Sequence, residues 1–216
     1  MKQHLKPLRS ITGVFLVFLL LCAFFAADIA ISDELSPDVM VKNVTNEVLD
    51  IIRKDKDIQS GNTRKASELI EAKVLPNFDF NRMTALAVGK DWRGATVEQK
   101  KVLIEEFHTL LVHTYANALT AYKSQAINFK PFKMAAGETD VTVKTEVKQP
   151  GAKSISIDYS LQKDGGTWKV YDVIVGGVSL VTSYRDQFKQ EIAASGIDSL
   201  IKSLQNKNQS ANLAKK

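Results

Sequence analysis

Side chains that could do metal, acid–base or nucleophilic chemistry are few in this sequence, and their spacing is poor. His108 and His113 are five residues apart in a stretch with helical periodicity, so they point about 140° apart and cannot share a metal ion. Asp158 and Asp172 fall in neighbouring predicted strands, and we interpret them as solvent-facing carboxylates rather than an acid–base pair. The one cysteine, Cys22, lies in the N-terminal leader, and no Gly-x-Ser-x-Gly motif occurs. The sequence therefore predicts neither a metal site nor an enzyme, although a hydrolytic pair such as Asp172 with Tyr159 remains an alternative.

A basic cluster accompanies the predicted strands. Acidic residues are mixed into it, and no aromatic residue is spaced for stacking on bases, so we do not expect nucleic-acid binding. The net charge of +5 is partly due to the leader, because no acidic residue precedes Asp28. The cluster comprises Lys130, Lys133, Lys144, Lys148 and Lys153.

Residues 1–30 have the pattern of a secretory signal peptide. Lys2, Lys6 and Arg9 form a basic start, an apolar run covers residues 11–27, and alanines follow near its end. An uncleaved membrane anchor is the alternative, although the run is at the short limit for crossing a bilayer. In either case we expect export, and a body without cysteine suits the bacterial periplasm.

The body of the chain has helical periodicity on both sides of a β region. Helices are predicted from Pro37 to about residue 52, over 63–75 before Pro76, and over the apolar segment 78–88. Thr96 and Gln99 form a capping-box pattern, which predicts the start of a long helix that reaches about Tyr122. A helix over 179–194, a cap at Gly196 and a last helix over 198–204 follow the β region.

Four strands are predicted between the helical parts, over 127–129, 141–147, 155–161 and 168–175. Apolar and polar residues alternate in the second and third, and Pro131 assigns the first to a sheet edge. The nearly continuous apolar run 168–175 indicates a strand covered on both faces. We therefore expect an α+β fold with an antiparallel sheet and several helices, a domain over 31–205 and a disordered polar tail over 206–216.

The sequence contains more apolar side chains than the core between one helix and one sheet would require. Several apolar helices against a sheet can fill a core or enclose a cavity. Patterning alone favours the filled core, and an exported adaptor with such a core is the alternative function.

Several stretches, in order, resemble the family of periplasmic phospholipid carriers of the Mla pathway, which maintains outer-membrane lipid asymmetry. The family is also known as the toluene-tolerance auxiliary components of an ABC transporter. The resemblance spans about residues 37–204. The stretches are WKVYDVIVGGVSLVT over 168–182, VLPNFDF over 74–80, ALAVG over 85–89 with Trp92, ATVEQ over 95–99 and GIDSL over 196–200.

The resemblance implies a curved, NTF2-like antiparallel sheet packed by helices around a deep apolar pocket for acyl chains. It implies a phospholipid ligand, no cofactor and no catalysis. It also implies exchange of lipid between an outer-membrane lipoprotein–porin complex and an inner-membrane ABC transporter complex, and we expect a monomer. The side chains that we expect to line the pocket are Leu75, Phe78, Met83, Phe107, Leu111, Tyr115 and Leu119 from the helices, and Val143, Val147, Ile157, Tyr159, Val173 and Val175 from the sheet.

Overall fold

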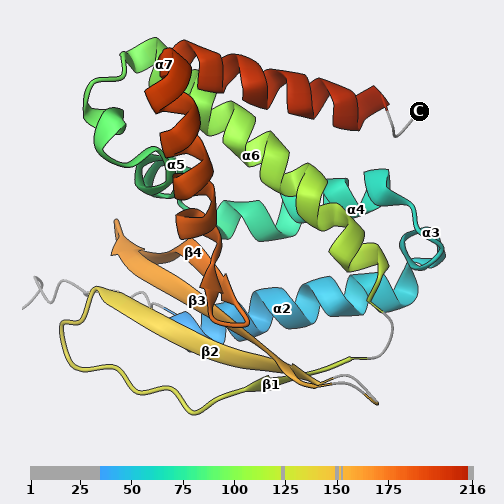
Figure 1. The fold of residues 1–216 in the computed structure, drawn as a ribbon. Helices are drawn as coiled ribbons and strands as arrows, with labels where there is room; N and C mark the ends of the chain where they lie inside the picture. The colour runs from blue at the N-terminus through green and yellow to red at the C-terminus, as the bar shows by residue number, and fades with distance from the viewer. Residues whose placement is uncertain (1–34, 123–124, 149–150, 152, 214–216) are drawn as a thin grey trace, which may run out of the picture. The chain divides into compact units, whose positions relative to one another are not determined.

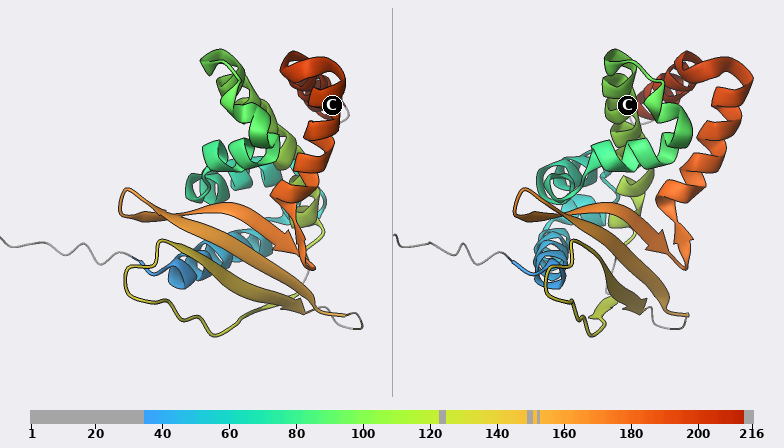
Figure 2. Two further views of the ribbon diagram at one scale, coloured as in Figure 1. Left: turned by 60° about the vertical axis from the view of Figure 1, so that its left-hand side comes forward. Right: turned by 90° about the vertical axis from the view of Figure 1, so that its left-hand side faces the viewer.

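One antiparallel sheet and the helices that pack against it form the fold of the described residues (Figure 1). The computed structural model describes residues 35–122, 125–148, 151 and 153–213, so the predicted signal peptide lies outside the described residues. In Figure 1 the sheet occupies the lower part of the view, α2 runs along it, and α4 to α7 stack above. The two further views in Figure 2 show that the sheet is twisted and curved. The predicted mixed fold with an antiparallel sheet is confirmed.

The sheet has five strands, one more than the four that were predicted. They follow chain order, and each pairs antiparallel with the next. The additional strand, β5, has two residues and directly follows the Gly176-Gly177 turn, so it is too short to leave an alternation pattern. The strands are β1 (Ala126–Phe129), β2 (Asp140–Lys148), β3 (Ile155–Asp164), β4 (Thr167–Val175) and β5 (Val178–Ser179).

Alternation places the apolar side chains of β2 and β3 on one face of the sheet. Val141, Val143 and Thr145 are buried, and the residues between them are exposed. The register puts Leu161 opposite Val141 and Tyr159 opposite Val143, so both strands present their apolar residues to the same side.

A β-bulge in β4 changes which of its side chains point to this face. Ser160 pairs with Asp172 but Leu161 pairs with Val170, which leaves Tyr171 as the additional residue in β4. Val170 and Val173 can therefore face the same side although an even alternation would separate them, and both belong to the hydrophobic cluster of the sheet.

The longer helices agree in position with the predicted segments, whereas the four-residue α3 (Lys56–Gln59) was not predicted. Several helix ends have clear local causes. Pro37 opens α2, where its missing N–H costs nothing. The predicted capping box of α6 is confirmed, because Thr96 Oγ1 accepts from the Gln99 N–H at 3.1 Å and Gln99 Oε1 accepts from the Thr96 N–H at 2.9 Å. The helices are α2 (Pro37–Lys54), α3 (Lys56–Gln59), α4 (Thr63–Leu69), α5 (Phe80–Val88), α6 (Val97–Thr120) and α7 (Leu180–Leu213). Three short segments join them: the π-helical η1 (Ile70–Val74) and the 3-10 helices η2 (Leu75–Asn77) and η3 (Gly89–Arg93).

The long helix α6 contributes to two separate hydrophobic clusters. Its first half, with Leu103 and Phe107 fully buried, packs with α5 and α7. Its second half, with Val112 and Ala116, packs with α2, α3 and α4. A third cluster lies on the sheet, where Val41 of α2 contacts the apolar face.

A polar cluster fastens α5 to the sheet. Asp79 caps α5 by accepting from the Arg82 N–H at 2.8 Å, and its other carboxylate oxygen accepts from Gln162 in β3 at 2.5 Å. The Arg82 guanidinium donates to Asp140 at 2.8 Å and lies 3.5 Å from the ring centre of Tyr171. These contacts fix the start of α5 against β2, β3 and β4.

The C-terminal part of α7 differs from the disordered tail predicted over 206–216. Gly196, with φ 80° and ψ 175°, kinks α7, and the helix then continues to Leu213. Leu204 and Asn208 are buried against the rest of the protein, and Asn208 Nδ2 donates to the Glu106 carbonyl at 2.9 Å and to its carboxylate at 2.7 Å. A polar composition suggested disorder, but within this segment the side chain of Asn208 is buried and its two hydrogen bonds to Glu106 connect it to α6. Residues 214–216 lie outside the described residues.

Candidate functional site

An apolar cavity of about 490 Å³ lies between α2, the end of α6 and the inner face of the sheet. This volume falls within the range of small-molecule pockets, roughly 300–1,000 Å³. Helix α2 contributes one wall along Val41, Val44, Val48 and Ile52, which follow a helical stripe. The inner face of β2, β3 and β4 forms the opposite wall.

Six of the thirteen predicted pocket residues line this cavity. Their side chains come from α6, from the consecutive strands β2, β3 and β4, and from the segment between η2 and α5. The register of the sheet brings Val147, Ile157 and Val175 to one end. The six are Phe78, Leu119, Val147, Ile157, Tyr159 and Val175.

The other seven lie elsewhere. Met83, Phe107 and Leu111 are buried in the cluster of α5, α6 and α7. Val143 is buried in the sheet cluster, Val173 packs against the same cluster, and Leu75 packs against the cluster of α2 to α4. Tyr115 is 40% exposed on α6. None of these seven is among the cavity-lining residues. From α6 only Ala118 and Leu119, in its last turn, line the cavity, so Phe107, Leu111 and Tyr115 lie too early in the helix. A ligand role for any of the thirteen stays a prediction.

The wall formed by α2 was not predicted as part of the pocket. Its stripe of Val41, Val44, Val48 and Ile52 was visible in the sequence, but the same stripe is typical of plain core packing. No sequence pattern distinguishes a helix face that meets a cavity from one that meets other side chains.

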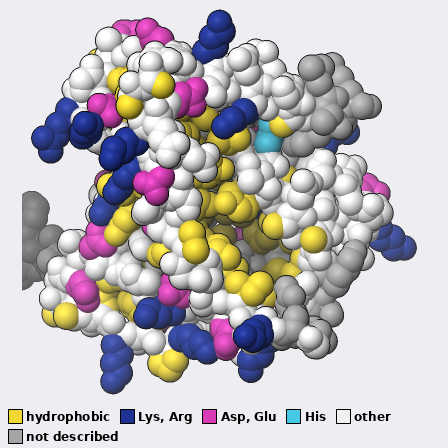
Figure 3. All heavy atoms as spheres, viewed as in Figure 1, with side chains coloured by type: hydrophobic (Ala, Val, Ile, Leu, Met, Phe, Trp, Pro, Cys, Tyr) yellow, Lys and Arg dark blue, Asp and Glu magenta, His cyan; other side chains and the backbone are white. Residues whose placement is uncertain are grey.

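The cavity opens at the end where α6 meets the ends of β3 and β4. Among its lining residues, Ala118, Ala121, Ile155 and Val175 are exposed, whereas Val41, Val48 and Leu49 are buried. Ile155 and Val175 are 38% and 41% exposed. Figure 3 shows hydrophobic side chains gathered around a hollow on this face, between the helices and the sheet. We call the set Ala118, Ala121, Ile155 and Val175 the mouth.

The two tyrosines at the cavity are engaged with the protein. Burial raises the pKa of the Tyr159 phenol, and a hydrogen bond with Thr145 partly offsets this. The Tyr122 hydroxyl accepts from Arg53 Nη2 at 2.9 Å and donates to the Gln125 carbonyl at 2.9 Å. The lining is mostly apolar and suits hydrocarbon, and its polar residues are Thr45, Asn77, Tyr122, Gln125 and Tyr159.

The carboxylates considered for acid–base chemistry do not meet at this cavity. Asp172 accepts from Ser179 Oγ at 2.5 Å and from the Val181 N–H at 3.0 Å, so it holds the first turn of α7. Asp158 lies opposite Lys144 and Ile174 in the sheet rather than opposite Asp172. Tyr159 faces the cavity, so Asp172 and Tyr159 serve separate parts of the fold.

Clusters of metal-ligating side chains and long apolar helices are both absent from the part of the chain that the structure describes. Among residues 35–122, 125–148, 151 and 153–213, no three His, Cys, Asp or Glu side chains gather closely enough to hold a metal ion. In the same residues, no helix is long and apolar enough to cross a membrane.

The chain is similar to proteins whose names concern lipid transport and solvent tolerance. It is 29% identical to the toluene tolerance protein ttg2D of Pseudomonas putida, over 76% of each chain. It is 24% identical to the intermembrane phospholipid transport system binding protein MlaC of Haemophilus influenzae, over 86% of this chain and 87% of that protein.

A solved structure has the same fold. It is the phospholipid-binding protein from Ralstonia solanacearum in complex with a phospholipid, with a TM-score of 0.77 and 35% identity over 82% of this chain and 99% of that one. The family model described as MlaC protein matches residues 42–206, which include all the cavity-lining residues except Met40 and Val41. The predicted family is thereby confirmed: this chain belongs to the MlaC family.

Proposed function

We propose that this protein is a phospholipid carrier that holds acyl chains in the cavity between α2, α6 and the sheet. The observation that carries the proposal is an apolar cavity of about 490 Å³ with a mouth at one end, in a chain that belongs to the MlaC family. The related structure from Ralstonia solanacearum, which contains a phospholipid, supports the same conclusion.

Physical chemistry explains why such a cavity suffices without a cofactor. Each methylene of an acyl chain gains about 0.8 kcal/mol when it leaves water for an apolar environment. A bilayer offers nearly the same gain, so a carrier needs a comparable apolar volume rather than a strong polar site. Binding by acyl chains also requires no covalent step, and we propose a non-enzymatic role.

The cellular setting follows from the family rather than from the cavity. We propose that the protein is exported to the periplasm and exchanges lipid with an inner-membrane Mla ABC transporter complex and an outer-membrane Mla lipoprotein–porin complex. The names of the relatives, which refer to intermembrane phospholipid transport and toluene tolerance, support this proposal.

A transfer assay with a blocked mouth tests the proposal. Ala118 lines the cavity and is exposed, whereas its neighbour Asn117 is exposed but does not line the cavity. We expect the wild-type protein and Asn117→Trp to move fluorescent phospholipid between donor and acceptor vesicles. We expect Ala118→Trp, with an unchanged melting temperature, to move it several-fold more slowly. A wild-type protein that moves no phospholipid contradicts the proposed function.

A further inference from the structure

Arg53 is a cation held at the same end of the cavity as the mouth. It occupies the last turn of α2, directly after the cavity-lining Ile52. Its Nη2 donates to the Tyr122 hydroxyl at 2.9 Å, and its guanidinium carbon lies 5.8 Å from the centre of the Tyr122 ring. Because the Tyr122 side chain itself lines the cavity, next to the exposed Ala121 of the mouth, this hydrogen bond fixes the guanidinium close to the opening.

The guanidinium keeps the capacity to bind an anion. Its side chain is 52% exposed, and its second contact is an ion pair with Asp50 at 3.2 Å whose carboxylate is 60% exposed. Exposed pairs of this kind are weak and are readily exchanged for a better partner. A guanidinium has five N–H donors, and the contacts to Asp50 and Tyr122 use two of them.

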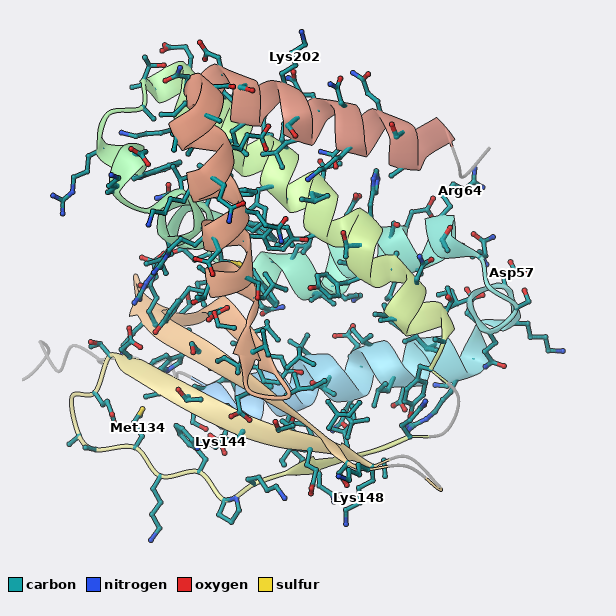
Figure 4. The ribbon with its side chains drawn as sticks, in the orientation of Figure 1. Asp57, Arg64, Met134, Lys144, Lys148 and Lys202 are labelled. Atoms are coloured by element: carbon teal, nitrogen blue, oxygen red, sulfur yellow. The ribbon has the colours of Figure 1, made fainter. Side chains whose placement is uncertain are left out.

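Further positive charge surrounds this end of the sheet. Lys148 follows the cavity-lining Val147, and Lys153 precedes Ile155 of the mouth by two residues; both lysines are exposed. Figure 4 labels Lys148 at this end of the sheet and Arg64 on α4, away from it. The lysines supply a favourable field, but only Arg53 combines a planar fork of donors with a hydrogen bond that limits its orientation.

We propose that Arg53 is a subsite for the phosphodiester of a phospholipid whose acyl chains occupy the cavity. The inference rests on the proposed function and adds to it the part of the headgroup that the protein recognises. A lipid with its chains between α2 and the sheet must leave its phosphate at the mouth, where water remains available. A phosphodiester there can accept two parallel N–H bonds from the fork while the Tyr122 contact holds the guanidinium in place. Recognition of this group, common to all glycerophospholipids, leaves the alcohol of the headgroup free to vary.

The test compares two lipids with the same acyl chains and different heads. The delipidated protein is offered 1-palmitoyl-2-oleoyl phosphatidylglycerol or the corresponding diacylglycerol, and the dissociation constant of each is measured. Arg53→Ala should weaken binding of the phospholipid by about tenfold or more, because a charge-assisted hydrogen-bond pair is lost, and should leave diacylglycerol binding unchanged. Arg53→Lys keeps the charge and loses the planar fork of donors. Its dissociation constant for the phospholipid should lie between those of the wild type and Arg53→Ala.

Arg64→Ala is the matched control. Arg64 is also exposed and is also paired with a carboxylate four residues away, but it lies on α4 and does not approach the cavity. The Arg64→Ala variant should bind both lipids with the dissociation constants of the wild type. Inorganic phosphate titrated into the delipidated protein by calorimetry provides the third arm, since a free anion has the same chemistry as the headgroup.

Three results overturn the proposal. Arg53→Ala could bind the phospholipid as tightly as the wild type, or it could lose both lipids equally, which would make Arg53 a structural support of the Tyr122 wall. Arg53-dependent binding of phosphate with no change in phospholipid affinity would assign the site to a free anion. Failure of the wild-type protein to bind either lipid would instead contradict the proposed function itself.

Discussion

Asp172 shows how a side chain that draws attention in the sequence can serve the fold alone. Its carboxylate accepts from Ser179 Oγ and from the Val181 N–H, so it satisfies donors at the start of α7 that have no partner within the helix. The same stretch, with its two glycines between strand and helix, carries the family resemblance. The hydrogen bonds of Asp172 at the junction between β4 and α7 therefore give this residue a structural role.

Replacement of Asp172 should therefore cost stability. Asp172→Ala should lower the free energy of unfolding by about 1–2 kcal/mol, the usual range for a lost helix cap. Asp158→Ala, on the neighbouring strand, is the control and should change it by less than about 0.5 kcal/mol. Urea titration followed by circular dichroism measures both. Equal values for the two variants would show that the Asp172 contacts do not hold α7.

His108 gives the fold a dependence on pH. Its half-buried ring meets Phe80 edge-on at 4.8 Å, and burial lowers its pKa below the ordinary value of 6.5, with Glu71 partly offsetting the effect. Since the unfolded chain binds the proton first, the neutral histidine's contribution is fully present above pH 6.5 and is lost as the pH falls toward the lowered folded pKa. Between about pH 7.5 and about pH 5.5 the urea midpoint should fall, and it should fall less in His108→Gln. An equal fall in both proteins would assign the change to other groups.

At the scale of elements, the sequence predicted where helices and strands lie along the chain better than it predicted which elements pack against them. Thr96 and Gln99 defined the start of α6 correctly, because a capping box is a local interaction. The face that α6 turns to the cavity was not predictable, because its apolar stripe continues while its neighbours change from α5 and α7 to α2 and α4. Phe107 and Leu119 therefore looked equivalent in the sequence, although only Leu119 lines the cavity. The strand β5 and the bulge at Tyr171 depend on pairing with other strands and leave no periodic signal.

The end of α7 provides a direct test of an element that the sequence pattern did not predict. A chain that stops after Gln205 loses Asn208, which is 4% exposed and donates twice to Glu106. This truncation should lower the free energy of unfolding by about 1–3 kcal/mol, because the buried hydrogen bonds disappear with the helix. An unchanged denaturation midpoint would mean that the last turns of α7 do not dock on α6.

At the scale of the whole molecule, the cavity results from the way in which α2 lies along the sheet (Figure 1). Val41 near the start of α2 packs on the sheet cluster, whereas Val48 and Ile52 belong to the cluster of helices. The cavity lies between these two contacts. It opens beside Ile155, the first residue of β3, and Val175, the last residue of β4. Composition predicted a surplus of apolar residues and could not decide between a filled core and a cavity, because both use the same side chains.

The most direct test of the carrier account is the content of the cavity in the protein as cells make it. The protein is purified without detergent from the cells that make it, extracted with organic solvent and analysed by mass spectrometry, with the protein concentration determined in parallel. A phospholipid carrier should contain phospholipid in stoichiometric amount. Its melting temperature should fall after the lipid is removed, since a ligand that binds only the folded state stabilises it. A protein that carries no lipid and takes up none from vesicles would contradict the account and favour an exported adaptor.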